Sequence, residues 1–104
     1  MIHVQIIGHD NSNLKALIKN AIVDGKIRSF EIAKVKGGLK ITHRRYIGSV
    51  NLTRRTAGPL IALVKCHNRD KEWQLLAAFI GRLAYHFKSD IAAINIQFAP
   101  TADR

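Results

Sequence analysis

The sequence has little from which a disulfide-bonded or cysteine-zinc fold could be built. It contains one cysteine in 104 residues, so it can form neither an intrachain disulfide nor a cysteine-rich zinc site. It has two prolines, and no proline-rich linker divides it. Charged residues interrupt every apolar run before the roughly 20 residues that a membrane-spanning helix needs. We therefore expect no membrane partner.

The beginning of the chain also lacks targeting features. Residues 1–7 have neither a basic lead nor the cleavage pattern of a secretory signal. The length suits one domain, and a hydrophobic fraction of 47% excludes wholesale disorder. We expect a single cytoplasmic α+β domain over residues 1–104, with the last four residues frayed.

Hydrophobic periodicity predicts seven elements in the order β-α-β-β-β-α-β. The expected strands cover residues 2–7, 27–35, 39–47, 60–64 and 91–98, and the expected helices cover residues 12–24 and 70–88. Two glycines, Gly37 and Gly38, predict a tight hairpin between the second and third strands. The polar stretch 51–57 is expected to be a loop. This order predicts a two-layer sandwich, with a mainly antiparallel five-stranded sheet and both helices on one face.

The second expected helix has a broad apolar face. We expect Trp73 to anchor it in the core and Gly81 to permit close packing, since a glycine inside a helix costs about 1 kcal/mol relative to alanine. In the last strand, Ile94, Ile96 and Phe98 are expected to point inward, because alternate residues of a strand share one face.

Positive charge is concentrated between the two expected helices. The chain has 17 Lys and Arg against 7 Asp and Glu, a formal net charge of +10. Residues 26–55 hold nine of the cations and a single acid, Glu31. The expected hairpin and the loop after it therefore carry +8 of the net charge.

Such a cluster is typical of a phosphate-binding surface, because Lys and Arg neutralise phosphates and release counterions. The same cations would also solvate the outer face of a hairpin and discourage edge-to-edge aggregation, so that interpretation stays open. The clustering favours non-catalytic binding of nucleic acid, with Arg44 and Tyr46 as base-side groups. The predicted nucleic-acid-binding residues are Lys34, Lys36, Lys40, Arg44, Arg45, Tyr46, Arg54 and Arg55.

RNA is favoured over DNA by an analogy of topology. Residues 12–88 are expected to run α-β-β-β-α, which is the order of elements in a double-stranded-RNA-binding domain. The analogy does not extend to the start of the last helix, where Arg69 and Lys71 alternate with Asp70 and Glu72. No motif identifies a family.

Two alternatives remain open. The first is a homo-oligomeric interaction protein, a homodimer, that pairs through the uncovered sheet face or an edge strand. Ala33, Val35, Ile61 and Leu63 would form the apolar patch on that face.

The second alternative is a small toxin-like ribonuclease, with His43 as general base and Arg45 holding the scissile phosphate. On a strand these two side chains would share one face, and Arg44 and Tyr46 the other. Cys66 and His67 are adjacent, so on a strand they point to opposite faces and cannot activate each other. The histidines and acids have no metal-ligand spacing, so we expect neither metal nor cofactor.

Overall fold

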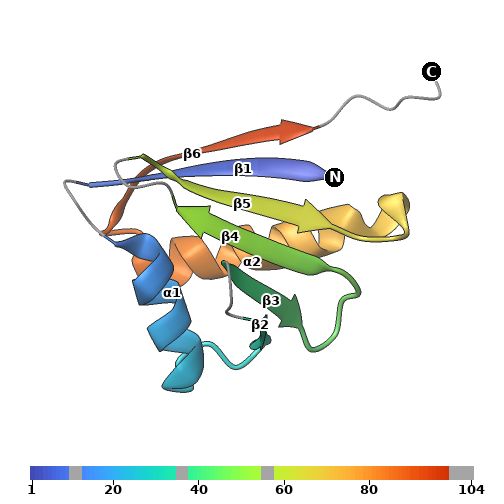
Figure 1. Ribbon diagram of the computed structural model, residues 1–104, viewed down its shortest axis with the longest axis horizontal. Helices are drawn as coiled ribbons and strands as arrows, with labels where there is room; N and C mark the ends of the chain where they lie inside the picture. Colours follow the sequence, from blue (N-terminus) through green and yellow to red (C-terminus); the bar gives the residue numbers. More distant parts are fainter. Residues whose placement is uncertain (10–12, 35–37, 55–57, 99–104) are drawn as a thin grey trace.

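The sheet contains one strand more than the sequence predicts (Figure 1). The computed structural model describes residues 1–9, 13–34, 38–54 and 58–98. Along the chain the elements are β1 (Ile2–Gly8), α1 (Leu14–Val23), β2 (Phe30–Lys34), β3 (Leu39–His43), β4 (Ser49–Arg54), β5 (Leu60–Lys65), a 3₁₀ turn η1 (Arg69–Lys71), α2 (Glu72–Phe87) and β6 (Ile91–Phe98). The predicted α+β class with an antiparallel sheet and two helices is confirmed.

The six strands lie in the order β2-β3-β4-β5-β1-β6, and all neighbours are antiparallel. β1 therefore lies between β5 and β6, which joins the two ends of the chain in one half of the sheet. The hairpin β2–β3 lies in the other half, as Figure 1 shows. The predicted turn of this hairpin includes Gly37, which lies outside the described residues.

Both helices pack on one face of the sheet and share a single core with it. In β1, β4 and β5, alternate residues are buried beneath the helices, as the two-residue period of a strand requires. The fully buried large side chains are Phe79, Ile6, Ile18, Leu39, Ile41, Leu52, Leu75, Leu83, Val4, Val50 and Val64. Among the described elements, no helix covers the opposite face of the sheet.

The buried stripe of α2 does not include Trp73. The helix buries Leu75, Phe79, Leu83 and Phe87, which repeat at helical spacing on one side. Trp73, expected as a core anchor, is instead 61% exposed. The expectation was wrong because Trp73 lies off this stripe, in the first turn of the helix.

The ends of the helices are fixed by polar side chains and by Gly25. The Asn13 side chain accepts the backbone N–H of Ala16 at the start of α1, and Gly25 follows the helix with φ of 80°, as the sequence predicts. The N-cap of α1 is therefore Asn13. Asn68 caps η1 by accepting the N–H of Asp70 at 3.0 Å.

Among the described residues, no helix is long and apolar enough to cross a lipid bilayer.

Gly48 controls how the chain enters β4. Its φ is +107°, and a Cβ atom there would lie 2.5 Å from the carbonyl oxygen of Lys65. A side chain is therefore opposed both by the backbone conformation and by a neighbouring strand that cannot yield.

We predict that Gly48→Ala lowers the free energy of unfolding by about 2 kcal/mol or more, since the strain and the overlap add. Urea denaturation of the two proteins measures the difference. Gly25→Ala is the matched control, because Gly25 also has positive φ but its Cβ would meet no atom within 4 Å. Equal losses in the two variants would contradict the role assigned to the Lys65 contact.

Candidate nucleic-acid interface

The structure separates most of the predicted basic residues into two groups, one on the uncovered face of the sheet and one on the turn between β3 and β4, and Arg54 lies apart from both. Lys34 and Lys40 are directly opposite each other in the β2–β3 ladder, so both project from the uncovered face. Arg54 follows the parity of the buried Val50 and Leu52, and so belongs to the helix side at the end of β4. Lys36 and Arg55 lie outside the described residues. The predicted cations therefore do not form one continuous surface.

The second group lies on the turn between β3 and β4. β3 ends at His43, so Arg44, Arg45 and Tyr46 do not alternate on a strand as expected. The Nδ1 atom of His43 accepts the backbone N–H groups of Arg45 at 3.0 Å and of Tyr46 at 3.3 Å. This pair of bonds folds the chain back, so that His43 and Tyr46, which were expected on opposite faces, come together.

Ring contacts hold the His43 imidazole in place. It stacks on Tyr46 with a centroid distance of 4.7 Å and meets the edge of Phe30 at 4.8 Å. Phe30 is itself buried, and its ring centroid lies 6.2 Å from that of Phe79 in α2. The turn is thus connected to the core through a chain of aromatic rings.

Arg44 is held on the uncovered side of the sheet. Its Nη1 atom forms an ion pair with Glu31 Oε1 at 2.6 Å, and its Nε donates to the carbonyl of Arg28 at 2.5 Å. Its backbone N–H donates to the carbonyl of Ser29 at 2.9 Å. The Glu31 carboxylate offsets the charge of Arg44, which makes this residue weaker as a phosphate ligand than the sequence suggests.

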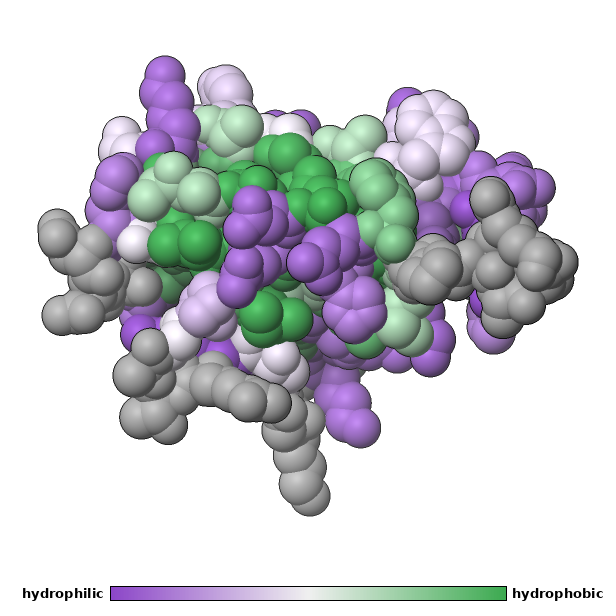
Figure 2. Space-filling model, turned by 90° about the horizontal axis from the view of Figure 1, so that it is seen from above, coloured by the Kyte–Doolittle hydropathy of each residue, from purple (hydrophilic) through white to green (hydrophobic). Residues whose placement is uncertain are grey.

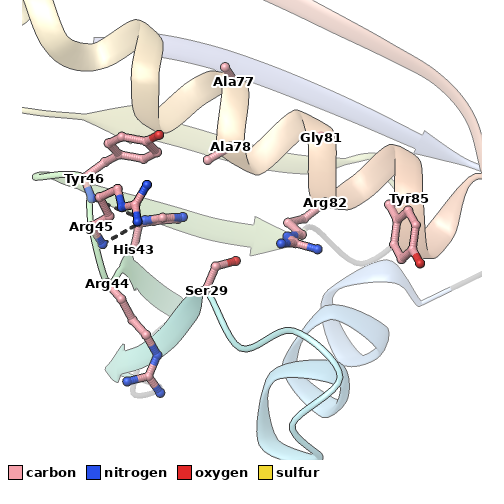
Figure 3. Close-up of a pocket in the computed structure, with 10 residues that line it drawn as sticks. All are labelled: Ser29, His43, Arg44, Arg45, Tyr46, Ala77, Ala78, Gly81, Arg82 and Tyr85. Atoms are coloured by element: carbon pink, nitrogen blue, oxygen red, sulfur yellow. Dashed lines mark hydrogen bonds between the residues drawn. The ribbon is translucent and has the colours of Figure 1, made fainter.

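Between this turn and α2 there is an open hollow of about 640 Å³ (Figure 3). Its floor is a run of small residues on α2, where Ala77, Ala78 and Gly81 leave space beside the helix. A Cβ atom at Gly81 would meet no atom within 4 Å. Gly81 therefore leaves space for a hollow and does not permit close packing, which corrects the expectation. The lining residues are Ser29, His43, Arg44, Arg45, Tyr46, Ala77, Ala78, Gly81, Arg82 and Tyr85.

The hollow is positively charged and has aromatic rings at both ends. Arg45 and Tyr46 lie at the end formed by the turn, and Arg82 and Tyr85 at the other end on α2 (Figure 3). No Asp or Glu is among the lining residues. Among the described residues neither Arg45 nor Arg82 has an ion pair, since the salt bridges there involve Met1 with Glu72 and Arg44 with Glu31.

Burial and the two arginines shift the titration of His43. Its pKa is lowered from 6.5, first by desolvation and then by the positive charges of Arg45 and Arg82. The neutral imidazole accepts hydrogen bonds at Nδ1, so its proton resides on Nε2. His43 is therefore poorly suited to act as a general base, because the nitrogen with a free lone pair is already occupied by two backbone amides.

Arg82 and Tyr85 are the site residues that the sequence analysis missed. Arg82 is the only Lys or Arg in residues 72–87, and it lies three residues from Tyr85 on one side of the helix. Small residues precede both on the same helix. An isolated cation and a tyrosine beside a run of small residues is the signal that could have indicated a helix lining a polar hollow.

A further polar group of the hollow is the Ser29 hydroxyl. Its Oγ atom is buried and has no hydrogen-bond partner among the described residues. Figure 3 shows this hydroxyl on the side of the hollow toward Arg82. It is therefore a donor and acceptor with no partner among the described residues, and it lies beneath the surface of the hollow.

The other candidate constellations do not assemble. Cys66 is buried, as expected, and its backbone N–H donates to the buried carboxylate of Glu72 at 3.2 Å. His67 is exposed. Within the described ranges, no three His, Cys, Asp or Glu side chains are grouped closely enough to hold a metal ion.

Comparison of the chain with protein-family models, with curated proteins and with solved structures finds no match. The geometry of the site is thus the ground on which a function can be argued.

The lowered pKa of His43 predicts a loss of stability in mild acid. In the unfolded chain His43 binds a proton near pH 6.5, whereas in the folded chain it does so only at a lower pH. The contribution of neutral His43 to the free energy of unfolding is therefore complete above pH 6.5 and is lost as the pH falls below it. We expect the free energy of unfolding to decrease between about pH 7.5 and about pH 5.5.

Urea denaturation at several pH values measures this dependence, and His43→Asn serves as the comparison because it removes the titrating group but keeps a hydrogen-bond acceptor. The His43→Asn curve should be flatter over the same range. Parallel curves for the two proteins would show that another group causes the dependence.

Proposed function

We propose that this protein binds single-stranded nucleic acid without cleaving it, with RNA preferred over DNA, and that the hollow between the β3–β4 turn and α2 receives the strand. The observation that carries the proposal is the pairing of two arginines without ion-pair partners among the described residues, Arg45 and Arg82, in a hollow with no acidic side chain. Guanidinium groups bind phosphate through several donors held in one plane.

The shape and lining of the hollow suit an unstacked nucleotide. A volume of about 640 Å³ lies within the range of about 300–1,000 Å³ that is typical of small-molecule sites. Tyr46 and Tyr85 offer ring faces on which a base can stack, and every base has a suitable face. A duplex presents its bases stacked and paired, so a recess of this size fits a single strand better.

RNA is preferred because of a polar group beneath the surface of the hollow. The Ser29 hydroxyl is buried and lacks a partner among the described residues, so a strand that displaces the side chains above it would offer it a ribose 2′-hydroxyl as partner. The topological ground for RNA no longer applies. The structure has four strands between the helices, whereas a double-stranded-RNA-binding domain has three.

The state of His43 supports binding without catalysis. In the ribonuclease alternative, His43 would remove a proton from the attacking hydroxyl while Arg45 held the phosphate. The Nδ1 lone pair is instead shared between two backbone N–H groups. The proposal therefore includes that RNA remains intact after incubation with the protein.

The lysines on the uncovered face provide a second, weaker contact. Lys34 and Lys40 are opposite each other across the β2–β3 ladder, a placement in which like charges repel. A phosphate between them would relieve that repulsion. We include these two residues as an extension of the bound strand, not as its centre.

Replacing the arginines of the hollow should weaken RNA binding and flatten its salt dependence. Arg45→Ala and Arg82→Ala should each raise the Kd for a short single-stranded RNA by about tenfold, equivalent to about 1.4 kcal/mol. Each should also reduce the slope of log Kd against log salt by about 0.7.

Fluorescence anisotropy at about 50 and about 200 mM salt measures both quantities. Arg69→Ala is the matched control, because Arg69 is exposed and does not line the hollow. If Arg69→Ala weakened RNA binding as much as the other two substitutions do, the attraction would be diffuse and electrostatic, which would contradict a local site.

The space beside Gly81 permits a test that separates binding from stability. Gly81→Ala should raise the free energy of unfolding by about 1 kcal/mol, because alanine favours the helix and its Cβ enters open space. Gly81→Leu should be folded as well, but its side chain should fill the hollow and raise the Kd for RNA by about tenfold or more. Wild-type affinity in the Gly81→Leu protein would show that RNA does not enter the hollow.

A further inference from the structure

The two edges of the sheet differ in how they are protected against further strands. In the described part of the chain, β6 is bonded only to β1, so the backbone groups on its outer side have no strand partner. Proteins usually protect such an edge with charges, a bulge or a proline. β6 extends over eight residues, Ile91–Phe98, and contains no charged residue and no proline.

The opposite edge has the protection that β6 lacks. β2 is five residues long and carries Glu31 and Lys34. The pairing is irregular at both edges, between Ile32 and Lys34 for β2 and β3, and between Ile7 and Gly8 for β1 and β6. The two edges therefore differ in length and in charge, and β6 is the longer and uncharged one.

The side of β6 that faces the helix layer is incompletely covered. Ile96 and Phe98 pair with the buried Val4 and Ile2 of β1, so their side chains project toward the helices. They point inward, as expected, but they are nevertheless 38% and 67% exposed. α2 packs against β5 and leaves β6 beyond its edge.

Figure 2 looks onto the molecule from the side on which β6 lies in Figure 1. It shows hydrophobic side chains gathered in the middle of this face, with hydrophilic side chains crossing them. The hydrophobic residues that the structure exposes on β1 and β6 are Ile7, Ile96 and Phe98. An open edge therefore lies beside exposed apolar side chains, the combination that a further strand would cover.

We propose that two copies of this chain associate through β6, edge to edge and antiparallel, so that their sheets continue into one another. A second copy is favoured over an acidic partner because β6 offers no cation for an acidic segment to neutralise. Association also requires two chains of net charge +10 to approach. The β6 edge permits this best, since Lys34 and Lys40 lie on the strands farthest from it.

The sequence of β6 is self-complementary in one register. A two-fold axis at Asn95 places Ile94 opposite Ile96 of the second copy. Both side chains project to the helix side, because their partners on β1 are the buried Ile6 and Val4, and residues directly opposite each other in an antiparallel ladder share a face. Phe98 lies opposite the segment 91–93 of the second copy, where the pairing with β1 shifts register. Asn95 meets its own counterpart on the uncovered face, where it already donates to Gln5 at 3.0 Å. The interface is isologous and closes at two copies.

Sedimentation velocity at a low and a high protein concentration tests the association. The wild-type protein should approach twice the monomer mass at the high concentration. Ile96→Lys and Phe98→Lys should each raise the dimer Kd by about tenfold or more, because the interface would bury an unpaired charge. Circular dichroism checks folding, and Phe98→Lys gives the result on its own if Ile96→Lys does not fold.

Two matched variants make the same substitution elsewhere. Val23→Lys changes a side chain of α1 that is 65% exposed, and it should dimerise as the wild-type protein does. Leu63→Lys lies on the uncovered sheet face and should also dimerise. A wild-type protein that stays monomeric would overturn the proposal. So would dissociation by Leu63→Lys without dissociation by Phe98→Lys, which would assign the contact to the sheet face.

Cross-linking tests the register independently of charge. Opposite Cα atoms in an antiparallel ladder are about 4.5–5.5 Å apart, which lies within the range that a disulfide can span. Oxidised Asn95→Cys should therefore form a covalent dimer, whereas Val23→Cys should not. Equal cross-linking of the two variants would overturn the proposed axis.

Discussion

The pair of hydrogen bonds that His43 Nδ1 accepts from Arg45 and Tyr46 is the constraint on which the candidate site depends. These bonds end β3 and reverse the chain, and they place Arg45 on the side of α2 and not on the uncovered face. Each bond contributes only about 1 kcal/mol, but the imidazole is also held between the rings of Phe30 and Tyr46. Without this turn, Arg45 and Arg82 would not line the same hollow.

The neutrality of His43 follows from the same environment. Partial burial and the nearby arginines disfavour its protonated form, and only the neutral ring can accept hydrogen bonds at Nδ1. The arginines that are proposed to bind phosphate therefore also favour the neutral ring over the protonated ring, and the neutral ring is the form that holds the turn. The proposed binding and the local structure depend on the same charges.

The two edges of the sheet differ in charge. The strands β2 and β3 carry Glu31, Lys34 and Lys40, whereas β6 at the far edge is uncharged and partly apolar. The hollow lies on the helix side, at the end of β3 and along α2. The proposed nucleic-acid site and the proposed dimer contact therefore lie in separate parts of the molecule, and either can be tested without disturbing the other.

The sequence predicts the class of fold well, because the alternation in residues 2–7, the apolar run 60–64 and the helical stripe from Leu14 are strong local signals. It misses β4, in which only Val50 and Leu52 are buried and the other four residues are polar. Pairing on both sides makes this segment a strand, and single-residue patterns do not contain that information.

The candidate site was predicted less completely for a related reason. The clustering of cations in residues 26–55 drew attention to Arg45 and Tyr46, which line the hollow, but the local sequence gives no account of what lies opposite them. Arg82 is 37 positions from Arg45 along the chain, and it reaches the hollow only because α2 packs across the sheet. Tertiary packing also separates Lys34 and Lys40 from the turn, although all of these residues belong to one basic stretch.

The most direct measurement is a titration of the isotope-labelled protein with a short single-stranded RNA, followed by the chemical shifts of the backbone amides. The account predicts that the largest changes occur at Ser29, Arg45, Gly81 and Tyr85, which come from three separate parts of the chain and meet only at the hollow. Changes confined to β2 and β3, with the α2 amides unaffected, would contradict it.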